Sequence, residues 1–209
     1  MQDLSGQVGI SLTQFVNFAT KPPEQQLTEA RRIKQQHMEG YDVPPDMYKQ
    51  FRDAVVRMHK QRRDKSYLDE VVARQTESSR VKHYPTLASG YKKFLGRKDV
   101  EWFDPPSGVW IFEDLRIKIT PELGLVINGR PTVIKLYLND SQTLIKRRAE
   151  IIIHLMKLGI PTLAEDDEVD ACVLDVRKGQ LFMAGKSDRE QSILLRAQAR
   201  NFVSMYREL

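Results

Sequence analysis

The dipeptide Asn128-Gly129 constrains the fold of this chain more than any other feature of its sequence. Asparagine and glycine readily adopt the positive φ angles of a type I′ turn, which joins two antiparallel strands. Apolar segments flank the dipeptide, so residues 123–127 and 132–138 are predicted to pair as a hairpin. Upstream, residues 115–119 alternate between apolar and polar, as in a half-buried strand. The sequence therefore predicts a three-stranded antiparallel meander.

The segments around this meander predict an α+β fold. Residues 141–158 are apolar around much of the helical circumference, which favours a buried helix packed against the sheet. A second hairpin, from strands 171–176 and 181–184, and a C-terminal helix are expected to follow. The helices expected before the sheet cover residues 11–20, 22–40, 44–63, 67–75 and 86–95. We expect a basic helical region, 1–98, and an α+β core, 99–209, that form one compact unit.

Composition narrows the class of protein. No apolar run approaches the ~20 residues that span a bilayer, and the N-terminus lacks the basic start and apolar core of a secretion signal. Cys172 is the only cysteine of the chain, so no internal disulfide can form. With 41% apolar and 29% charged residues, the chain is typical of a folded protein, and a cytoplasmic location is expected.

The positive charge is concentrated in the first half of the chain. Residues 21–98 hold 18 Lys and Arg against 10 Asp and Glu, whereas residues 99–209 hold 15 against 17. Such asymmetry is typical of proteins that bind a polyanion. It is equally compatible with a solvated helical face that only keeps the protein soluble.

Motifs of several enzyme classes are absent from the sequence. It contains no phosphate-binding loop, dinucleotide glycine motif, zinc cysteine set or His-Glu-x-x-His. The four histidines are scattered, and His154 lies on the apolar helix, where a core histidine is expected. His83, beside Tyr84 in a basic segment predicted to be a loop, is more suggestive of function.

The order helix, three-stranded meander, helix, strand is similar to the core of the PD-(D/E)XK nuclease superfamily. The resemblance covers roughly residues 109 to 176. It implies an acidic residue on the second strand and an acidic-x-Lys pair on the third, which bind Mg²⁺ and position the attacking water. Glu122 would then be the second-strand acid and metal ligand, and Lys135 the catalytic lysine.

Strand geometry shows that this motif is incomplete. Side chains alternate along a strand, so Lys135 shares its face with the residue two before it. That residue is Val133, where the superfamily has its second acid. Asp114, Glu113 or Asp140 would have to supply the missing ligand. Otherwise Glu122 ends a turn, and Lys135 is a solvent-side strand residue.

Three functional hypotheses follow from these observations. The first is a nucleic-acid-binding protein with a nuclease-like core, possessing a degenerate metal site. The basic residues expected to contact nucleic acid are Arg62, Arg63, Lys82, Lys92, Lys93, Arg97 and Lys98. The second is a non-catalytic subunit or assembly protein, with the apolar last helix available for a homo-oligomer or complex. The third is an active nuclease that requires Mg²⁺ and uses Glu122, Lys135 and Asp114.

Overall fold

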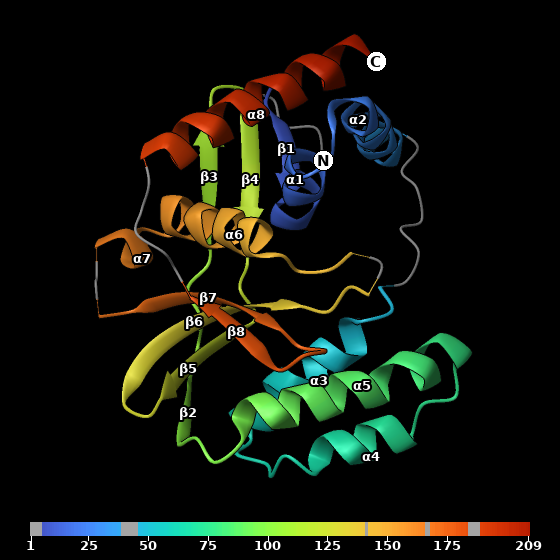
Figure 1. Ribbon diagram of the computed structural model, residues 1–209, viewed down its shortest axis with the longest axis vertical. Helices are drawn as coiled ribbons and strands as arrows, with labels where there is room; N and C mark the ends of the chain where they lie inside the picture. The colour runs from blue at the N-terminus through green and yellow to red at the C-terminus, as the bar shows by residue number, and fades with distance from the viewer. Residues whose placement is uncertain (1–5, 39–45, 141, 166–167, 184–188) are drawn as a thin grey trace.

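The computed structural model describes residues 6–38, 46–140, 142–165, 168–183 and 189–209, and it shows an α+β fold with a C-terminal helix (Figure 1). A three-stranded sheet has the order β1-β4-β3, and a five-stranded sheet has the order β2-β5-β6-β7-β8. None of the described helices has the length and apolar character needed to cross a membrane. The elements in chain order are β1 (Val8–Ser11), α1 (Leu12–Ala19), α2 (Pro23–Met38), α3 (Lys49–Lys60), α4 (Tyr67–Ala73), α5 (Ser78–Leu95), β2 (Val100–Phe103), β3 (Gly108–Phe112), β4 (Leu115–Ile119), β5 (Leu123–Ile127), β6 (Arg130–Tyr137), α6 (Lys146–Gly159), α7 (Pro161–Glu165), β7 (Asp170–Asp175), β8 (Gln180–Met183) and α8 (Arg189–Glu208).

The hairpin predicted at Asn128-Gly129 is confirmed and joins β5 to β6 in the larger sheet. The two turn residues have positive φ angles of 50° and 85°, and Ile127 pairs with Arg130 across the turn. From β6 the chain passes through α6 and the short α7 to β7, which is parallel to β6. β7 then turns back into the antiparallel β8, which confirms the second hairpin.

The strand predicted at residues 115–119 is present, but its predicted place in the meander is wrong. β4 pairs with β3 and β1 in the smaller sheet, and β2 occupies the place beside β5. The alternation of β4 shows that one of its faces is buried, and it carries no information about which strand lies alongside. The β3–β4 hairpin is therefore an excursion of the chain between β2 and β5.

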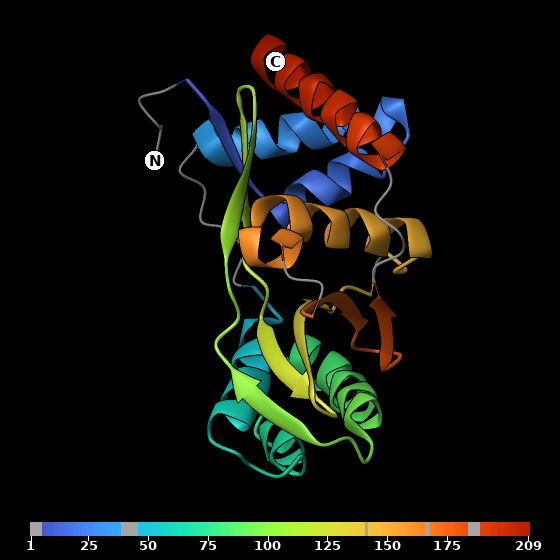
Figure 2. The same cartoon turned by 90° about the vertical axis from the view of Figure 1, so that its left-hand side faces the viewer.

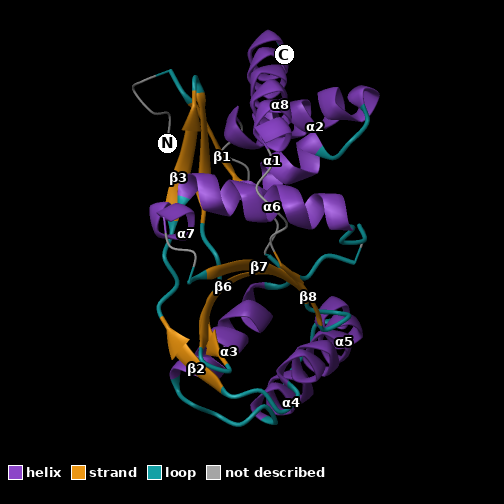
Figure 3. Cartoon of the chain, turned by 60° about the vertical axis from the view of Figure 1, so that its left-hand side comes forward, coloured by secondary structure: helices purple, strands orange, loops and turns teal. Residues whose placement is uncertain are grey.

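Helix α6 lies between the two sheets and is buried along most of its length (Figures 1 and 3). Its apolar side chains share one core cluster with the small sheet, with α1, α2 and α8, and with Val133 and Val173 of the large sheet. Figure 2 shows α1, α2 and α8 gathered on one side of the small sheet. The predicted buried helix is confirmed, although it begins at Lys146 instead of residue 141, which lies outside the described residues.

Helices α3, α4 and α5 cover the other face of the large sheet. Ile134 and Leu136 of β6, with Cys172 and Leu174 of β7, belong to a second core cluster with these helices. The helices of the first 98 residues thus divide between two cores, with α1 and α2 in the first and α3 to α5 in the second. Because both faces of β6 are covered, Lys135 does not lie on a solvent-facing side of a sheet.

Helix α5 begins earlier than the sequence indicates. It spans Ser78–Leu95 and continues through Pro85, where the sequence predicts a loop. Proline lacks the N–H that would bond the carbonyl of Val81. Val81 is 50% exposed and Pro85 is also exposed, so the missing hydrogen bond lies on the solvent side of the helix. His83 is consequently a helical residue.

Candidate nucleic-acid interface

Glu122 and Lys135, the two residues singled out by the nuclease resemblance, form an ion pair in the structure. Lys135 Nζ lies 2.5 Å from Glu122 Oε1, and the two side chains are only 15% and 14% exposed. Lys135 Nζ also donates to the Thr120 carbonyl at 3.0 Å. The second carboxylate oxygen of Glu122 accepts the backbone N–H of Leu136 at 2.8 Å. The expectation of a solvent-side lysine is therefore wrong. The charged groups of both residues are bonded to each other and to nearby backbone groups.

The acids that the sequence offers as the missing ligand are engaged with other partners. Glu113 pairs with Arg200 at 2.6 Å, and Asp140 lies 3.3 Å from His83. Val133 is fully buried in the core cluster of α6. Asp114 lies at the far end of β4 from Glu122, where it pairs with Arg207 at 2.9 Å. Within the described ranges, no three His, Cys, Asp or Glu side chains gather into a group that could hold a metal ion.

These residues do not fit a Mg²⁺ site. The ion prefers octahedral oxygen coordination, and enzyme sites commonly supply one or two carboxylates together with substrate phosphates. The carboxylate of Glu122 is already neutralised by the ammonium of Lys135. A cation would have to displace that ammonium without the second acid that the superfamily places at the position of Val133.

A different group of side chains forms a polar stripe along α5. Lys82, Thr86, Ser89 and Lys93 are exposed and are spaced four, three and four residues apart, which places them on one helical face. The opposite face of α5 is buried in the second core cluster. Neither lysine forms an ion pair within the described part of the chain. We call these four residues the α5 stripe.

The turn between β7 and β8 packs against α5 through two glycines. A Cβ on Gly90 of α5 would lie 2.0 Å from the carbonyl oxygen of Val176, and one on Gly179 would lie 2.5 Å from the carbonyl oxygen of Gly90. Neither contact leaves room for a side chain. Gly179 also has a φ of 63°, a conformation that glycine adopts at little cost. The turn is thereby held directly against the helix.

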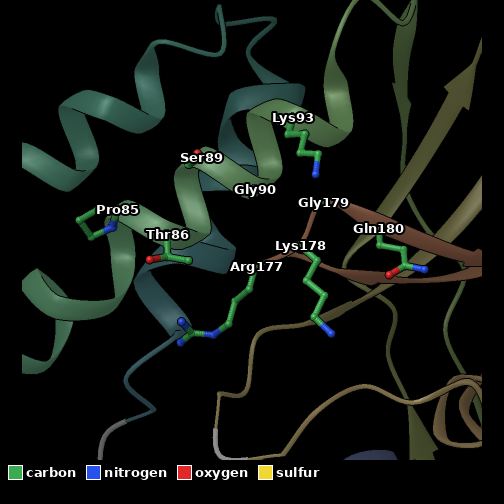
Figure 4. Close-up of a pocket in the computed structure, with 9 residues that line it drawn as sticks. All are labelled: Pro85, Thr86, Ser89, Gly90, Lys93, Arg177, Lys178, Gly179 and Gln180. Carbon is green, nitrogen blue, oxygen red and sulfur yellow. The ribbon is translucent and has the colours of Figure 1, made fainter.

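An open pocket of about 920 Å³ lies between the α5 stripe and this turn (Figure 4). Lys93 extends from the helix, and Lys178 and Gln180 extend from the turn. None of the nine described residues that line the pocket is acidic. They are Pro85, Thr86, Ser89, Gly90, Lys93, Arg177, Lys178, Gly179 and Gln180. This α5–turn pocket combines three cations, two hydroxyls and an amide, which suits an anionic ligand. Lys178 Nζ lies 3.7 Å from the buried Asp175 carboxylate, but its side chain remains 54% exposed.

Arg177 is held at the pocket by groups from other parts of the chain. Its Nε donates to the Leu138 carbonyl at 3.1 Å, and its Nη2 donates to the Tyr48 hydroxyl at 3.2 Å. Nη2 also lies 3.9 Å from Asp140 Oδ2. Desolvation acts to raise the pKa of Asp140, but electrostatic attraction to the neighbouring Arg177 and His83 side chains, together with hydrogen bonds that include one from the Tyr48 hydroxyl, outweighs it, so the pKa of this carboxyl is lowered. The carboxylate therefore stays charged at neutral pH and helps to fix the guanidinium.

Several of the other basic residues expected to contact nucleic acid are engaged elsewhere. Lys92 pairs with Asp69 of α4 at 2.6 Å. The guanidinium of Arg63 lies 4.4 Å from the centre of the Tyr67 ring, and Arg62 precedes it in the connection between α3 and α4. The structure does not bring these three residues into the α5–turn pocket.

The end of α5 holds the last two of the predicted residues. Lys98 donates to the carbonyl of Phe94 and lies over its ring, 5.0 Å from the ring centre. Arg97 is exposed just beyond the end of the helix. Of the seven residues, Lys82 and Lys93 therefore lie on the α5 stripe, and only Lys93 lines the pocket.

Arg177 and Lys178 line the pocket but are not among the residues that the sequence predicts to bind a ligand. A signal is present, because Arg177-Lys178-Gly179-Gln180 is the basic turn of the second predicted hairpin. The turn and α5 are far apart in the sequence, and only the folded chain places them side by side.

Comparison with known proteins yields no family assignment. No protein-family model matches the chain, and no curated protein matches it.

Proposed function

We propose that this chain binds nucleic acid and that the α5–turn pocket contacts the phosphate backbone. The observation that carries the proposal is the grouping of Lys93, Arg177 and Lys178 with two hydroxyls at one open pocket that no acidic residue lines. Asp140 beside Arg177 and Asp175 beside Lys178 offset part of this charge, whereas Lys93 has no acidic partner among the described residues. Lysine and arginine neutralise phosphates and supply most of the sequence-independent affinity. Serine and threonine hydroxyls donate to phosphate oxygens. Lys82 extends the cationic surface by further turns of α5, so that more than one phosphate can be bound.

The second part of the proposal is a nuclease-like core with a degenerate metal site. The elements β5, β6, α6 and β7 keep the order hairpin, helix, strand of the resemblance. The place of the first strand of the meander, predicted at residues 115–119, is taken beside β5 by β2, which precedes the β3–β4 hairpin in the chain. The close approach of Glu122 to Lys135 is a further point of support. Val133 in place of an acid favours binding without hydrolysis. The chain is then a binding protein, and the ion pair is a remnant of the catalytic arrangement.

A direct binding measurement tests the first part. Fluorescence anisotropy with labelled single-stranded DNA, duplex DNA and RNA at low salt should show binding by the wild type. The double variant Lys93→Ala/Lys178→Ala should bind about 30-fold more weakly, because two charged phosphate contacts of about 1 kcal/mol each are lost. The matched control is Arg31→Ala/Arg189→Ala, which removes two exposed charges from α2 and α8. Figure 1 places these helices at the opposite end of the molecule from α5.

Two results would count against this part of the proposal. One is an absence of binding to all three nucleic acids at the lowest salt. The other is an equal loss of affinity in the double variant and in its control, since the α5–turn pocket would then have no special role.

A cleavage assay tests the second part. With Mg²⁺ added, the wild type should bind the oligonucleotides and leave them intact. Cleavage that is abolished both by a chelator and by Glu122→Ala would contradict the degenerate site and would favour the active nuclease.

Assembly through protein contacts is the alternative function, and one observation favours it. Ile193 and Leu194 near the start of α8 are 57% and 60% exposed. The inner face of α8, which includes Leu195 and Phe202, is buried in the core of this chain and is not available to a partner. Sedimentation of the wild type and of Ile193→Ser/Leu194→Ser discriminates the two functions. An oligomer that the variant dissociates would support assembly.

A further inference from the structure

His83 lies at a branch point beside the α5–turn pocket. Its Nδ1 is 3.3 Å from Arg177 Nη2 and also 3.3 Å from Asp140 Oδ2. Arg177 lines the pocket, and Thr86, another lining residue, follows His83 on α5 by about one helical turn. The imidazole is therefore in a position to act on the anion-binding residues.

The two contacts of Nδ1 require opposite protonation states. A guanidinium has only donors, so Arg177 can bond Nδ1 only when that nitrogen carries a lone pair. The carboxylate of Asp140 has only acceptors, so it can bond Nδ1 only when that nitrogen carries a proton. In the doubly protonated imidazolium both nitrogens are donors. The imidazolium can donate a hydrogen bond to the Asp140 carboxylate, and its positive charge repels the Arg177 guanidinium.

We propose that protonation of His83 strengthens binding of the phosphate backbone at the α5–turn pocket, an inference that rests on the proposed function. Two effects act in the same direction. The imidazolium adds a positive charge close to the pocket. It also takes over the pairing with Asp140 and ceases to accept from Arg177, which leaves the guanidinium available to the bound anion. By linkage, the anion must favour uptake of a proton to the same extent.

The charged groups around His83 support this direction. From outside its own helix, the described groups that face it are Asp140, Arg177 and the Tyr48 hydroxyl, which itself donates to Asp140 Oδ1 at 3.3 Å. Desolvation raises the pKa of Tyr48, so this hydroxyl remains neutral. Asp140 is the one acid in this group, and it serves as the common partner for which His83 and Arg177 compete.

The test compares affinities at pH 8 and pH 6 at constant ionic strength. The probe is a labelled oligonucleotide with hydroxyl ends, because phosphodiesters do not titrate in this range. Wild type should bind about fivefold more tightly at pH 6, at the lower end of the usual coupling between sites. His83→Gln should lose this difference. His83→Lys, which carries a permanent charge, should bind tightly at both pH values.

The control is His37→Gln, which removes a histidine on α2 that contacts Tyr206 of α8. This variant should keep the pH dependence of the wild type. Equal pH dependence in wild type and in His83→Gln would overturn the inference and leave the proposed function intact. A wild type that binds at neither pH would overturn both.

A measurement on the unmodified chain keeps the inference testable if the variants fold poorly. Calorimetric titration of wild type with the same oligonucleotide at pH 6.5, in two buffers of different ionisation enthalpy, reports the protons exchanged on binding. Net proton uptake is the expected result. Binding without proton uptake would contradict the role of His83.

Discussion

At the scale of single residues, both oxygens of the Glu122 carboxylate are engaged inside the protein. One pairs with Lys135, and the other accepts the backbone N–H of Leu136. The segment before β5 is thereby tied to the middle of β6. In this account the pair has a structural role, because loss of either partner leaves the other group in a site with little access to water.

A double-mutant cycle measures this role. Glu122→Gln and Lys135→Met should each lower the free energy of unfolding by about 3 kcal/mol, because each leaves a largely buried charge without its partner. The double variant should lower the free energy of unfolding by less than the sum of the two single changes, and the difference, the coupling energy, should be at least about 1 kcal/mol. The same cycle on the exposed pair Glu113 and Arg200 should give less than about 1 kcal/mol. Additive effects at Glu122 and Lys135 would refute the structural role.

His59 supplies a pH dependence of stability. Burial lowers the pKa of this imidazole to about 4, against about 6.5 in an unfolded chain. Between these values the unfolded chain binds a proton that the folded chain does not. The contribution of His59 to the free energy of unfolding is therefore complete above pH 6.5 and is lost as the pH falls toward 4.

Urea unfolding at pH 7 and pH 5 tests this dependence. On going to pH 5, wild type should lose about 2 kcal/mol more stability than His59→Gln, which has no imidazole to protonate. Other titrating groups contribute to both proteins and cancel in the comparison. Equal losses in the two proteins would show that the burial of His59 has no such consequence.

At the scale of elements, the sequence predicts local structure better than it predicts the partners of each element. The Asn128-Gly129 turn sets its own hairpin, because the positive φ angles are a local requirement. β4 is a strand as expected, yet its neighbours β1 and β3 could not be read from its alternating pattern. β1 has only four residues, too few for its alternation to identify it. The loop predicted at Pro85 is absent because the helix tolerates the loss of one hydrogen bond at an exposed position.

Gly90 tests the packing of α5 against the β7–β8 turn. Alanine in an exposed helix interior is ordinarily about 1 kcal/mol more favourable than glycine. At this position its Cβ would meet backbone oxygens of Val176 and Arg177. Gly90→Ala should therefore destabilise the protein by about 1–3 kcal/mol, and it should weaken nucleic-acid binding by moving the turn.

The control for this change is Ser89→Ala, at the adjacent exposed position of α5. Its effect on stability in thermal unfolding should stay within about 0.5 kcal/mol. A Gly90→Ala protein that is as stable as Ser89→Ala would mean that the turn does not pack tightly on the helix.

At the scale of the whole molecule, the basic residues of the first half of the chain do not gather on a single surface. The basic front half divides between two cores, and Lys92 and Arg63 of this half are engaged in internal contacts. The candidate interface draws Lys93 from the front half and Lys178 from the back half. The sequence alone could indicate a polyanion partner and the lysines of α5. It could not show that these lysines lie beside the β7–β8 turn, which is distant in the chain.

The salt dependence of binding is the most direct test of the central claim that the α5–turn pocket contacts phosphates. The logarithm of the affinity for a single-stranded oligonucleotide falls linearly with the logarithm of salt concentration, by about 0.7 for each phosphate neutralised. Loss of two contacts in Lys93→Ala/Lys178→Ala should reduce the steepness of this line by about 1.4, whereas Arg31→Ala/Arg189→Ala should leave it unchanged. An unchanged slope in the pocket variant would contradict the account.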